Sequence, residues 1–210
     1  MKKNKIIKPK ISKFLTETIL KKEDIYQDIV DLFIQEQEID FQIQGIEFNG
    51  CKFINVDFSK YPFVNVSIID CIFEKCNLSG CSFSNQGIHR TVFEGCNLVG
   101  CDFISSSLQD LSILNSKCNY INFSDSKIKH FKIETSVLKE GRVVSSSLED
   151  IIFDNVDFSE CEFLNTKLKE IDFSNCNIQD IGISPSDIKG IIVNEQQALM
   201  LVNLLGIIIK

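Results

Sequence analysis

The side chains best able to do chemistry in this chain of 210 residues are nine cysteines and two histidines. Cysteine and histidine bind zinc, and a thiolate beside an imidazole can act as a nucleophile. Both uses require the groups to converge. The sequence has no CxxC pair, and neither His89 nor His130 has a plausible nucleophile paired to it. There is also no glycine-rich phosphate loop. We therefore expect no enzymatic activity, no metal site and no cofactor.

The spacing of the cysteines indicates a repeat instead. Cys71, Cys76 and Cys81 lie five residues apart, and a large apolar residue follows each of them by two positions. Helices and strands repeat about every 3.6 and 2 residues, so neither element explains an interval of five. The elements that position these thiols must repeat with a period of five residues.

Every fifth residue from Ile43 to Val193 is apolar, without interruption over 31 positions, and 13 of the 17 phenylalanines lie on this register. A second register, two residues earlier, holds eight of the nine cysteines together with Val, Ile, Ser and Thr. The other three positions are mostly polar or glycine. Each unit thus points one large and one smaller side chain inward, which is typical of a solenoid.

The units "CNLSG", "CNLVG", "VDFSE" and "IDFSN" resemble the A(D/N)LXX consensus of the pentapeptide-repeat family. This resemblance implies an all-β fold, a right-handed quadrilateral β-helix with four pentads in each coil. Residues 20 apart should then stack, and Phe63, Phe83, Phe103 and Phe123 would form one column. The 31 units make nearly eight coils, or a rod about 37 Å long at ~4.8 Å per coil.

Inside such a core the cysteines are expected to act as small apolar residues. Stacking would bring Cys51 near Cys71, at a Cα separation of ~4.8 Å that a disulfide permits. Parallel side chains and a reducing compartment argue against bridges. The chain has no apolar run near the ~18 residues of a membrane span and no signal peptide, so we expect a cytoplasmic protein without membrane contact.

The two ends should cap the solenoid of residues 41–193. At the C-terminal end, Asn194 and Gln197 form a capping-box pattern that predicts a helix from about 195 to 205, ended by Gly206. Residues 194–210 are apolar over most of their surface, which favours a homodimer joined through this end. A well-packed monomer cap is the alternative. The predicted interface residues are Leu199, Leu201, Val202, Leu204, Leu205 and Ile207.

Residues 1–40 are predicted to form an N-terminal tail and cap. Residues 25–33 have apolar positions at helical spacing, yet Ile29, Ile34 and Ile39 are five apart, so either a helix or an extra coil in shifted phase is possible. Residues 1–13 are basic and are expected to be a flexible tail.

The net charge of −7 comes from residues 41–193, which carry 13 basic against 20 acidic residues. Stacking would align carboxylates in rows at ~5–10 Å intervals. One face would carry Asp70, Asp110, Glu149, Asp150 and Glu170, and a neighbouring face Glu140, Glu160 and Asp180. Duplex DNA has one charge per ~1.7 Å of axis, so these rows could imitate it at lower density. The alternative is an ordinary polar surface, interrupted by lysines.

The stretches "IHRTVFEGCNLVGCDFISSSLQD" and "SPSDIKGIIVNEQQALMLVNLLGIIIK" resemble the Qnr quinolone-resistance proteins, in particular the chromosomal Gram-positive type. This resemblance implies a dimer that imitates DNA, binds DNA gyrase and topoisomerase IV, and protects them from quinolones. The unbroken register leaves no room for the loops of plasmid-borne members.

Three functions are therefore considered. The first is a non-enzymatic, DNA-mimicking topoisomerase-binding protein that does not itself bind DNA. The second is a generic β-helical interaction scaffold. The third is immunity against a topoisomerase-poisoning peptide.

Overall fold

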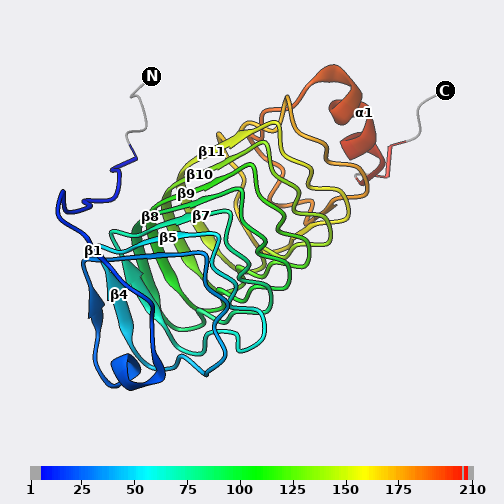
Figure 1. Cartoon of the computed structure of the whole chain (residues 1–210). Coiled ribbons are helices and arrows are strands. Elements are labelled where there is room, and N and C mark those ends of the chain that lie inside the picture. Colours follow the sequence, from blue (N-terminus) through cyan, green and yellow to red (C-terminus); the bar gives the residue numbers. More distant parts are fainter. Residues whose placement is uncertain (1–5, 205, 208–210) are drawn as a thin grey trace.

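The chain forms a right-handed β-helix whose coils stack into a rod, with a single helix at its C-terminal end (Figure 1). The computed structural model describes residues 6–204, 206 and 207. The strands are β1 (Thr16–Glu17), β2 (Ile29–Val30), β3 (Leu32–Gln35), β4 (Glu47–Asn49), β5 (Lys52–Ile54), β6 (Ser67–Ile69), β7 (Ile72–Glu74), β8 (Gly87–Glu94), β9 (Ser107–Leu114), β10 (Lys127–Glu134), β11 (Ser147–Asp154), β12 (Glu162–Phe163) and β13 (Gly182–Ile183). A short 3₁₀ helix, η1 (Lys22–Tyr26), and α1 (Glu195–Leu204) complete the fold.

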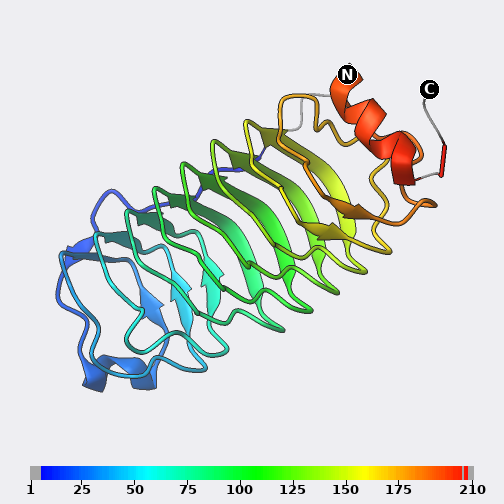
Figure 2. The same ribbon diagram turned by 90° about the vertical axis from the view of Figure 1, so that its right-hand side faces the viewer.

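The long strands confirm a coil of 20 residues. Ile88 pairs with Leu108, which pairs with Ile128, which pairs with Leu148, all in parallel register. Strands β8 to β11 lie side by side along the rod (Figure 2). Because each coil places the same pentad position over the one before, residue types sort into columns that run along the axis.

Phenylalanine columns fill the core. The ring centroids of Phe83 and Phe103 are 4.8 Å apart, and those of Phe103 and Phe123 are 5.0 Å apart, with nearly parallel planes. Phe53 and Phe73 stack in a second column at 4.6 Å. These offset stacks add to the free energy gained by burying the rings. The predicted column of Phe63, Phe83, Phe103 and Phe123 is confirmed.

The second inward register holds small residues that satisfy the backbone. All nine cysteines are buried and free, as predicted. Further along the rod serine takes the same position: the Ser126 hydroxyl donates to the Phe103 carbonyl at 2.5 Å and accepts from the Ser106 N–H at 3.1 Å. Thiol and hydroxyl groups therefore occupy the same inward position in different coils.

The chain turns its corners in the left-handed region. One residue in most pentads has a φ between +47° and +83°, and many of these residues are not glycine, for example Asp70, Asp110 and Asp150. Asn and Asp tolerate this conformation because their short side chains can bond the local backbone. The corners thus fix the direction of several charged side chains.

The N-terminal region contains the shifted coil, not the alternative helix. Ile29 pairs with Phe48 and Phe33 with Lys52, offsets of 19 residues instead of 20, and η1 precedes this coil. The flexible tail expected for residues 1–13 is corrected in part, because residues 6–13, here called the N-terminal arm, follow a defined path. Hydrogen bonds tie this arm to Asp70 and Asp110 in the solenoid.

Helix α1 covers the last coil. The Asn194 side chain accepts from the Gln197 N–H at 3.0 Å, and the Gln197 side chain accepts from the Asn194 N–H at 2.9 Å, which is the predicted capping box. Gly206 has a φ of +69°, as expected of the residue that follows a helix. Leu201 packs into the core cluster. The helix thereby closes the open end of the solenoid.

Candidate interaction surface

One corner of the solenoid stacks six charged or titratable residues at intervals of 20. This corner row consists of Asp70, Arg90, Asp110, His130, Asp150 and Glu170, and every member has a positive φ. The strand register places these residues one above another along the axis. Acidic and basic groups alternate over the first five members, so the row is not a run of like charge.

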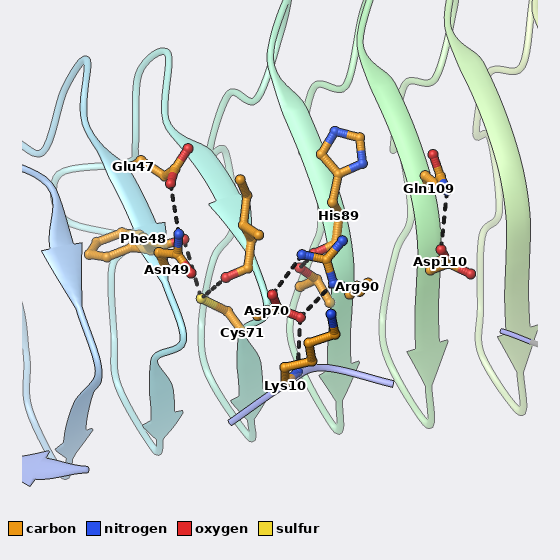
Figure 3. Close-up of polar contacts among 12 residues, drawn as sticks. Lys10, Glu47, Phe48, Asn49, Asp70, Cys71, His89, Arg90, Gln109 and Asp110 are labelled. Carbon is orange, nitrogen blue, oxygen red and sulfur yellow. Dashed lines mark hydrogen bonds and ion pairs between the residues drawn. The ribbon is translucent and has the colours of Figure 1, made fainter. Parts of the chain in front are cut away.

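The acidic and basic members of the corner row pair with each other. Arg90 binds Asp70 through two bonds, Nε to Oδ1 at 2.7 Å and Nη2 to Oδ2 at 2.6 Å (Figure 3). The ring of His130 lies between two carboxylates, with Nδ1 3.1 Å from Asp110 Oδ1 and Nε2 3.4 Å from Asp150 Oδ2. These pairs link the row over three coil intervals, one from Asp70 to Arg90 and two from Asp110 to Asp150.

The structure divides the corner row into a covered and an open half. The side chains of Asp70 and Asp110 are only 10% and 1% exposed, whereas those of Asp150 and Glu170 are 44% and 79% exposed. The prediction that Asp70 and Asp110 face outward on an open surface is therefore wrong. The N-terminal arm covers both, and sequence periodicity cannot show where a non-repetitive segment docks.

The ionised form of Asp70 is stabilised where it lies. Burial alone would raise the pKa of its carboxyl. The hydrogen bonds from the Arg90 guanidinium and the Lys10 N–H, with the positive charges of both residues, outweigh burial and lower that pKa. Asp70 is thus a charged acceptor that requires donors around it.

A second acidic row is open along its length. Glu140, Glu160 and Asp180 are exposed and sit at equivalent corners, with φ values of 57°, 60° and 55°. Lys139 Nζ lies 2.9 Å from Glu160 Oε1, so the row is partly neutralised. The hydrogen bond that Glu140 accepts raises the pKa of the exposed Tyr120 phenol in the preceding coil.

Exposed carboxylates in the corner row and next to it are also paired with lysines. Glu149 Oε1 lies 2.7 Å from Lys129 Nζ, and Glu170 Oε1 lies 3.3 Å from Lys169 Nζ. Exposed pairs of this kind contribute little to stability, about 0–1 kcal/mol, and they exchange partners readily. A cationic partner could therefore replace the lysines.

The residues predicted for the dimer interface differ in exposure. Leu199, Leu204 and Ile207 are exposed, at 57%, 40% and 52%, and Val202 is half-buried. Leu201 is only 6% exposed and belongs to the core, so it cannot serve an interface with another chain. Leu205 lies outside the described residues.

Two contacts were not anticipated from the sequence. The Gln197 side chain donates to the carbonyls of Phe173 and Cys176 at 2.8 and 2.7 Å. Arg90 pairs with Asp70, and here a signal existed, because opposite charges 20 residues apart must stack in a coil of that length. Gln197 offered no such signal beyond its place in the capping box.

Residues 6–204, 206 and 207 contain no group of three or more His, Cys, Asp or Glu side chains arranged to hold a metal ion. No helix in this described part of the chain has the length and apolar character to cross a membrane.

The repeat itself matches known proteins. Residues 66–143 match the family described as pentapeptide repeat region, and residues 46–85 and 145–180 match pentapeptide repeats. This chain belongs to the pentapeptide-repeat family. The matches to this family cover most of the solenoid and agree with the right-handed β-helix seen in the structure.

Solved pentapeptide-repeat structures resemble this chain at low sequence identity. A trypsin-treated variant of QnrB1, described as a plasmid-mediated fluoroquinolone resistance protein, is 19% identical, with 88% of this chain and 99% of that chain covered and a TM-score of 0.45. HetL from the cyanobacterium Nostoc, involved in heterocyst differentiation regulation, is 10% identical over 81% of this chain and 91% of its own, with a TM-score of 0.25. No curated protein sequence matches this pentapeptide-repeat protein.

Proposed function

We propose that this pentapeptide-repeat protein is a non-enzymatic DNA mimic that binds DNA gyrase or topoisomerase IV and protects it from quinolones. The observation that carries the proposal is the second acidic row, Glu140, Glu160 and Asp180, exposed at equivalent corners of successive coils. A regular row of carboxylates on a straight rod offers a DNA-binding surface a charge pattern of the kind that duplex phosphates offer.

Rigidity supports this use of the row. The backbone N–H groups of Glu140 and Glu160 donate to the Ser159 and Gln179 carbonyls of the next coil, so the solenoid fixes these left-handed corners. Asp180 extends from the equivalent corner of the last coil. A preorganised surface loses little conformational entropy on binding. Complementary charge speeds association and makes it sensitive to salt. We therefore expect tight binding at low ionic strength that weakens as salt is added.

The resemblance to Qnr proteins supports the choice of partner and drug class. QnrB1, a similar solved structure, is described as a fluoroquinolone resistance protein. A generic scaffold and an immunity protein against a topoisomerase-poisoning peptide are the alternative functions. The first would bind no topoisomerase, and the second would protect against a peptide poison and not against quinolones.

The homodimer belongs to the same proposal. Leu199 and Leu204 are exposed apolar residues of α1, and Ile207, which follows the helix, is exposed as well. Burying them against a second copy would remove apolar surface from water at ~25 cal/mol per Å². Joined at this end, two rods would present one longer acidic surface.

A supercoiling assay tests the function directly. Purified gyrase is inhibited with ciprofloxacin, and this protein is titrated in. Restored supercoiling at up to one protein dimer per gyrase is the expected result. Inhibition without rescue would support DNA mimicry and contradict protection, and no effect at large excess would contradict the proposed function.

Charge reversal identifies the surface. The triple variant Glu140→Lys, Glu160→Lys, Asp180→Lys is expected to weaken gyrase binding at least tenfold, because it replaces the acidic row by a basic one. The matched control, Glu23→Lys, Asp40→Lys, Asp125→Lys, changes the net charge equally at exposed positions outside the row. Affinity is measured by surface plasmon resonance at two salt concentrations. Equal losses in both variants would mean that only net charge matters.

A further inference from the structure

The N-terminal arm binds the covered half of the corner row through its backbone. The Lys10 N–H donates to Asp70 Oδ1 at 2.8 Å, and the Ile7 N–H donates to Asp110 Oδ1 at 2.9 Å. In Figure 3 the arm passes across the strands below Asp70, with Lys10 next to the Asp70–Arg90 pair. The solenoid thus holds an extended peptide by main-chain groups.

The repeat distances of arm and solenoid agree. Asp70 and Asp110 are two coils apart, about 9.6 Å at ~4.8 Å per coil. The two donors, the N–H groups of Ile7 and Lys10, are three positions apart in the arm, which is about 10 Å at ~3.3 Å per extended residue. Any extended segment can therefore offer an N–H to each carboxylate, whatever its side chains. The corner row is spaced to bind a backbone.

The two acceptors are charged and buried beneath the arm. Asp110, whose side chain is 1% exposed, also receives Gln109 Nε2 at 3.4 Å and faces His130 Nδ1 at 3.1 Å. Asp70 receives Arg90 and the Lys10 N–H. A buried carboxylate that loses a donor becomes costly, by about 1–3 kcal/mol or more, so the site favours an occupied state.

The arm does not fill the space it covers. A cavity of about 450 Å³ lies between arm residues, including Ile7 and Pro9, and the strand residues Ile72, Val92 and Leu114. The Ile7 side chain is 45% exposed. A few polar contacts above an apolar cavity can hold the arm in place and still allow another segment to replace it, with larger apolar side chains in the cavity.

The charged residues around the cavity favour a basic segment over an acidic one. Glu74 and Glu94 line the cavity together with Lys132, and the arm contributes Lys8. Glu74 is paired with Lys52 at 2.8 Å and Lys132 is paired with Glu134. Glu94 has no ion pair in the described part of the chain. A lysine beside the backbone donors therefore meets a net acidic surface.

We infer that the groove formed by Asp70, Asp110 and the adjoining faces of β7, β8 and β9 binds an extended, lysine-containing segment of a protein partner. Residues 6–10 are the intramolecular occupant of this groove. A partner segment gains access by displacing the arm, which exposes the covered half of the corner row. Recognition uses two backbone N–H groups three residues apart and apolar side chains that enter the cavity.

The test uses the full chain and a labelled peptide of residues 4–14, NKIIKPKISKF, in fluorescence anisotropy. The variant Ile7→Pro, Lys10→Pro removes both backbone donors and should vacate the groove. We expect it to bind the peptide at least tenfold more tightly than the wild type. The matched control is Ser12→Pro, Lys13→Pro, which alters two arm residues outside the cavity lining whose N–H groups make no hydrogen bond in the described structure, and it should behave as the wild type.

Adding Asp110→Asn to the vacated variant should weaken peptide binding at least fivefold, and a peptide with proline at the positions of Ile7 and Lys10 should not bind. Equal binding to the vacated variant and the wild type would overturn the inference, as would binding that ignores Asp110→Asn. The assay contains no topoisomerase, so its outcome is independent of the proposed function.

Limited proteolysis gives a second readout if the proline variant folds poorly. Trypsin cleaves after Lys10, whose N–H is bound to Asp70. In the Asp110→Asn chain, which keeps the arm sequence, we expect this cleavage to be at least threefold faster than in the wild type. Unchanged cleavage would show that the arm is not held by the corner row, and would overturn the inference.

Discussion

At the scale of single residues, the same pentad position carries different chemistry in different coils. The inward small position is a thiol in Cys81 and Cys161 and a hydroxyl in Ser126, and all three are buried. Burial raises the pKa of the Cys81 and Cys161 thiols to about 12, because an ionised sulfur in this core would lose its hydration. These cysteines are structural groups, and buried neutral thiols are poor nucleophiles.

The raised thiol pKa predicts how stability depends on pH. The thiol of an unfolded cysteine ionises near pH ~8.5, whereas the buried thiol of the folded protein stays protonated to higher pH. The folded state is therefore fully stabilised by this thiol below pH ~8.5 and loses that stabilisation as the pH rises. Between pH ~9 and about 12, Cys81 should contribute a loss in the free energy of unfolding of about 1.4 kcal/mol per pH unit. Urea denaturation of the wild type and Cys81→Ala over this range measures the contribution.

The variant should show a shallower slope than the wild type by that amount. Ser79→Ala, which alters the same coil without removing a thiol, is the control and should keep the wild-type slope. Parallel curves for the wild type and Cys81→Ala would contradict the pKa argument.

At the scale of elements, each strand depends on neighbouring coils for its hydrogen bonds. Strands β12 and β13 have two residues each; β12 bonds the coils before and after it, and β13 pairs with β12 in the coil before. The last coil has no following coil, so its carbonyls need another partner. Helix α1 supplies one through Gln197, which bonds the carbonyls of Phe173 and Cys176.

Replacing Gln197 tests this capping role. Gln197→Ala removes both donors to the last coil and half of the capping box with Asn194. We expect the free energy of unfolding to fall by about 1–3 kcal/mol, since the Cys176 carbonyl loses its donor and the Phe173 carbonyl retains one, the Cys176 N–H. Gln196→Ala, at the exposed neighbouring position, should change it by less than about 0.5 kcal/mol. Thermal and urea denaturation give both values, and equal effects would contradict the role.

At the scale of the whole molecule, the rod has two ends and each is closed differently. The shifted N-terminal coil and η1 close one end, and α1 closes the other with apolar side chains still exposed. The proposed dimer uses that exposed surface. The proposed dimer interface consists of Leu199, Leu204 and Ile207, which are exposed, and excludes Leu201, which is buried in the core.

The double variant Leu199→Glu, Leu204→Glu should therefore be monomeric in light scattering at concentrations where the wild type is dimeric, because four carboxylates would meet across a two-fold interface. Gln196→Glu is the matched control for added negative charge on α1 and should remain dimeric. A double variant that stays dimeric would place the interface elsewhere, and a monomeric wild type would contradict the dimer.

What the sequence determined by itself was everything that repeats. The interval of five and the burial of the phenylalanines and cysteines follow from periodicity, because each coil can bury its apolar residues only against its neighbours. The coil of 20 residues, and with it the phenylalanine columns, follows from the resemblance to pentapeptide repeats. The capping box at Asn194 and Gln197 was equally readable, since it is a local pattern. Stacking also placed the acidic residues in rows before their exposure was known.

Only the tertiary structure decided what covers the repeat. The arm lies over Asp70 and Asp110, which are 60 and 103 residues from the arm residues that bind them, and no periodic signal connects segments so far apart. Likewise Leu199 and Leu201 are the same residue type two positions apart, yet one is exposed and the other buried. The packing of α1 on the last coil fixes the rotation of the helix about its axis, and this rotation determines which leucine is buried.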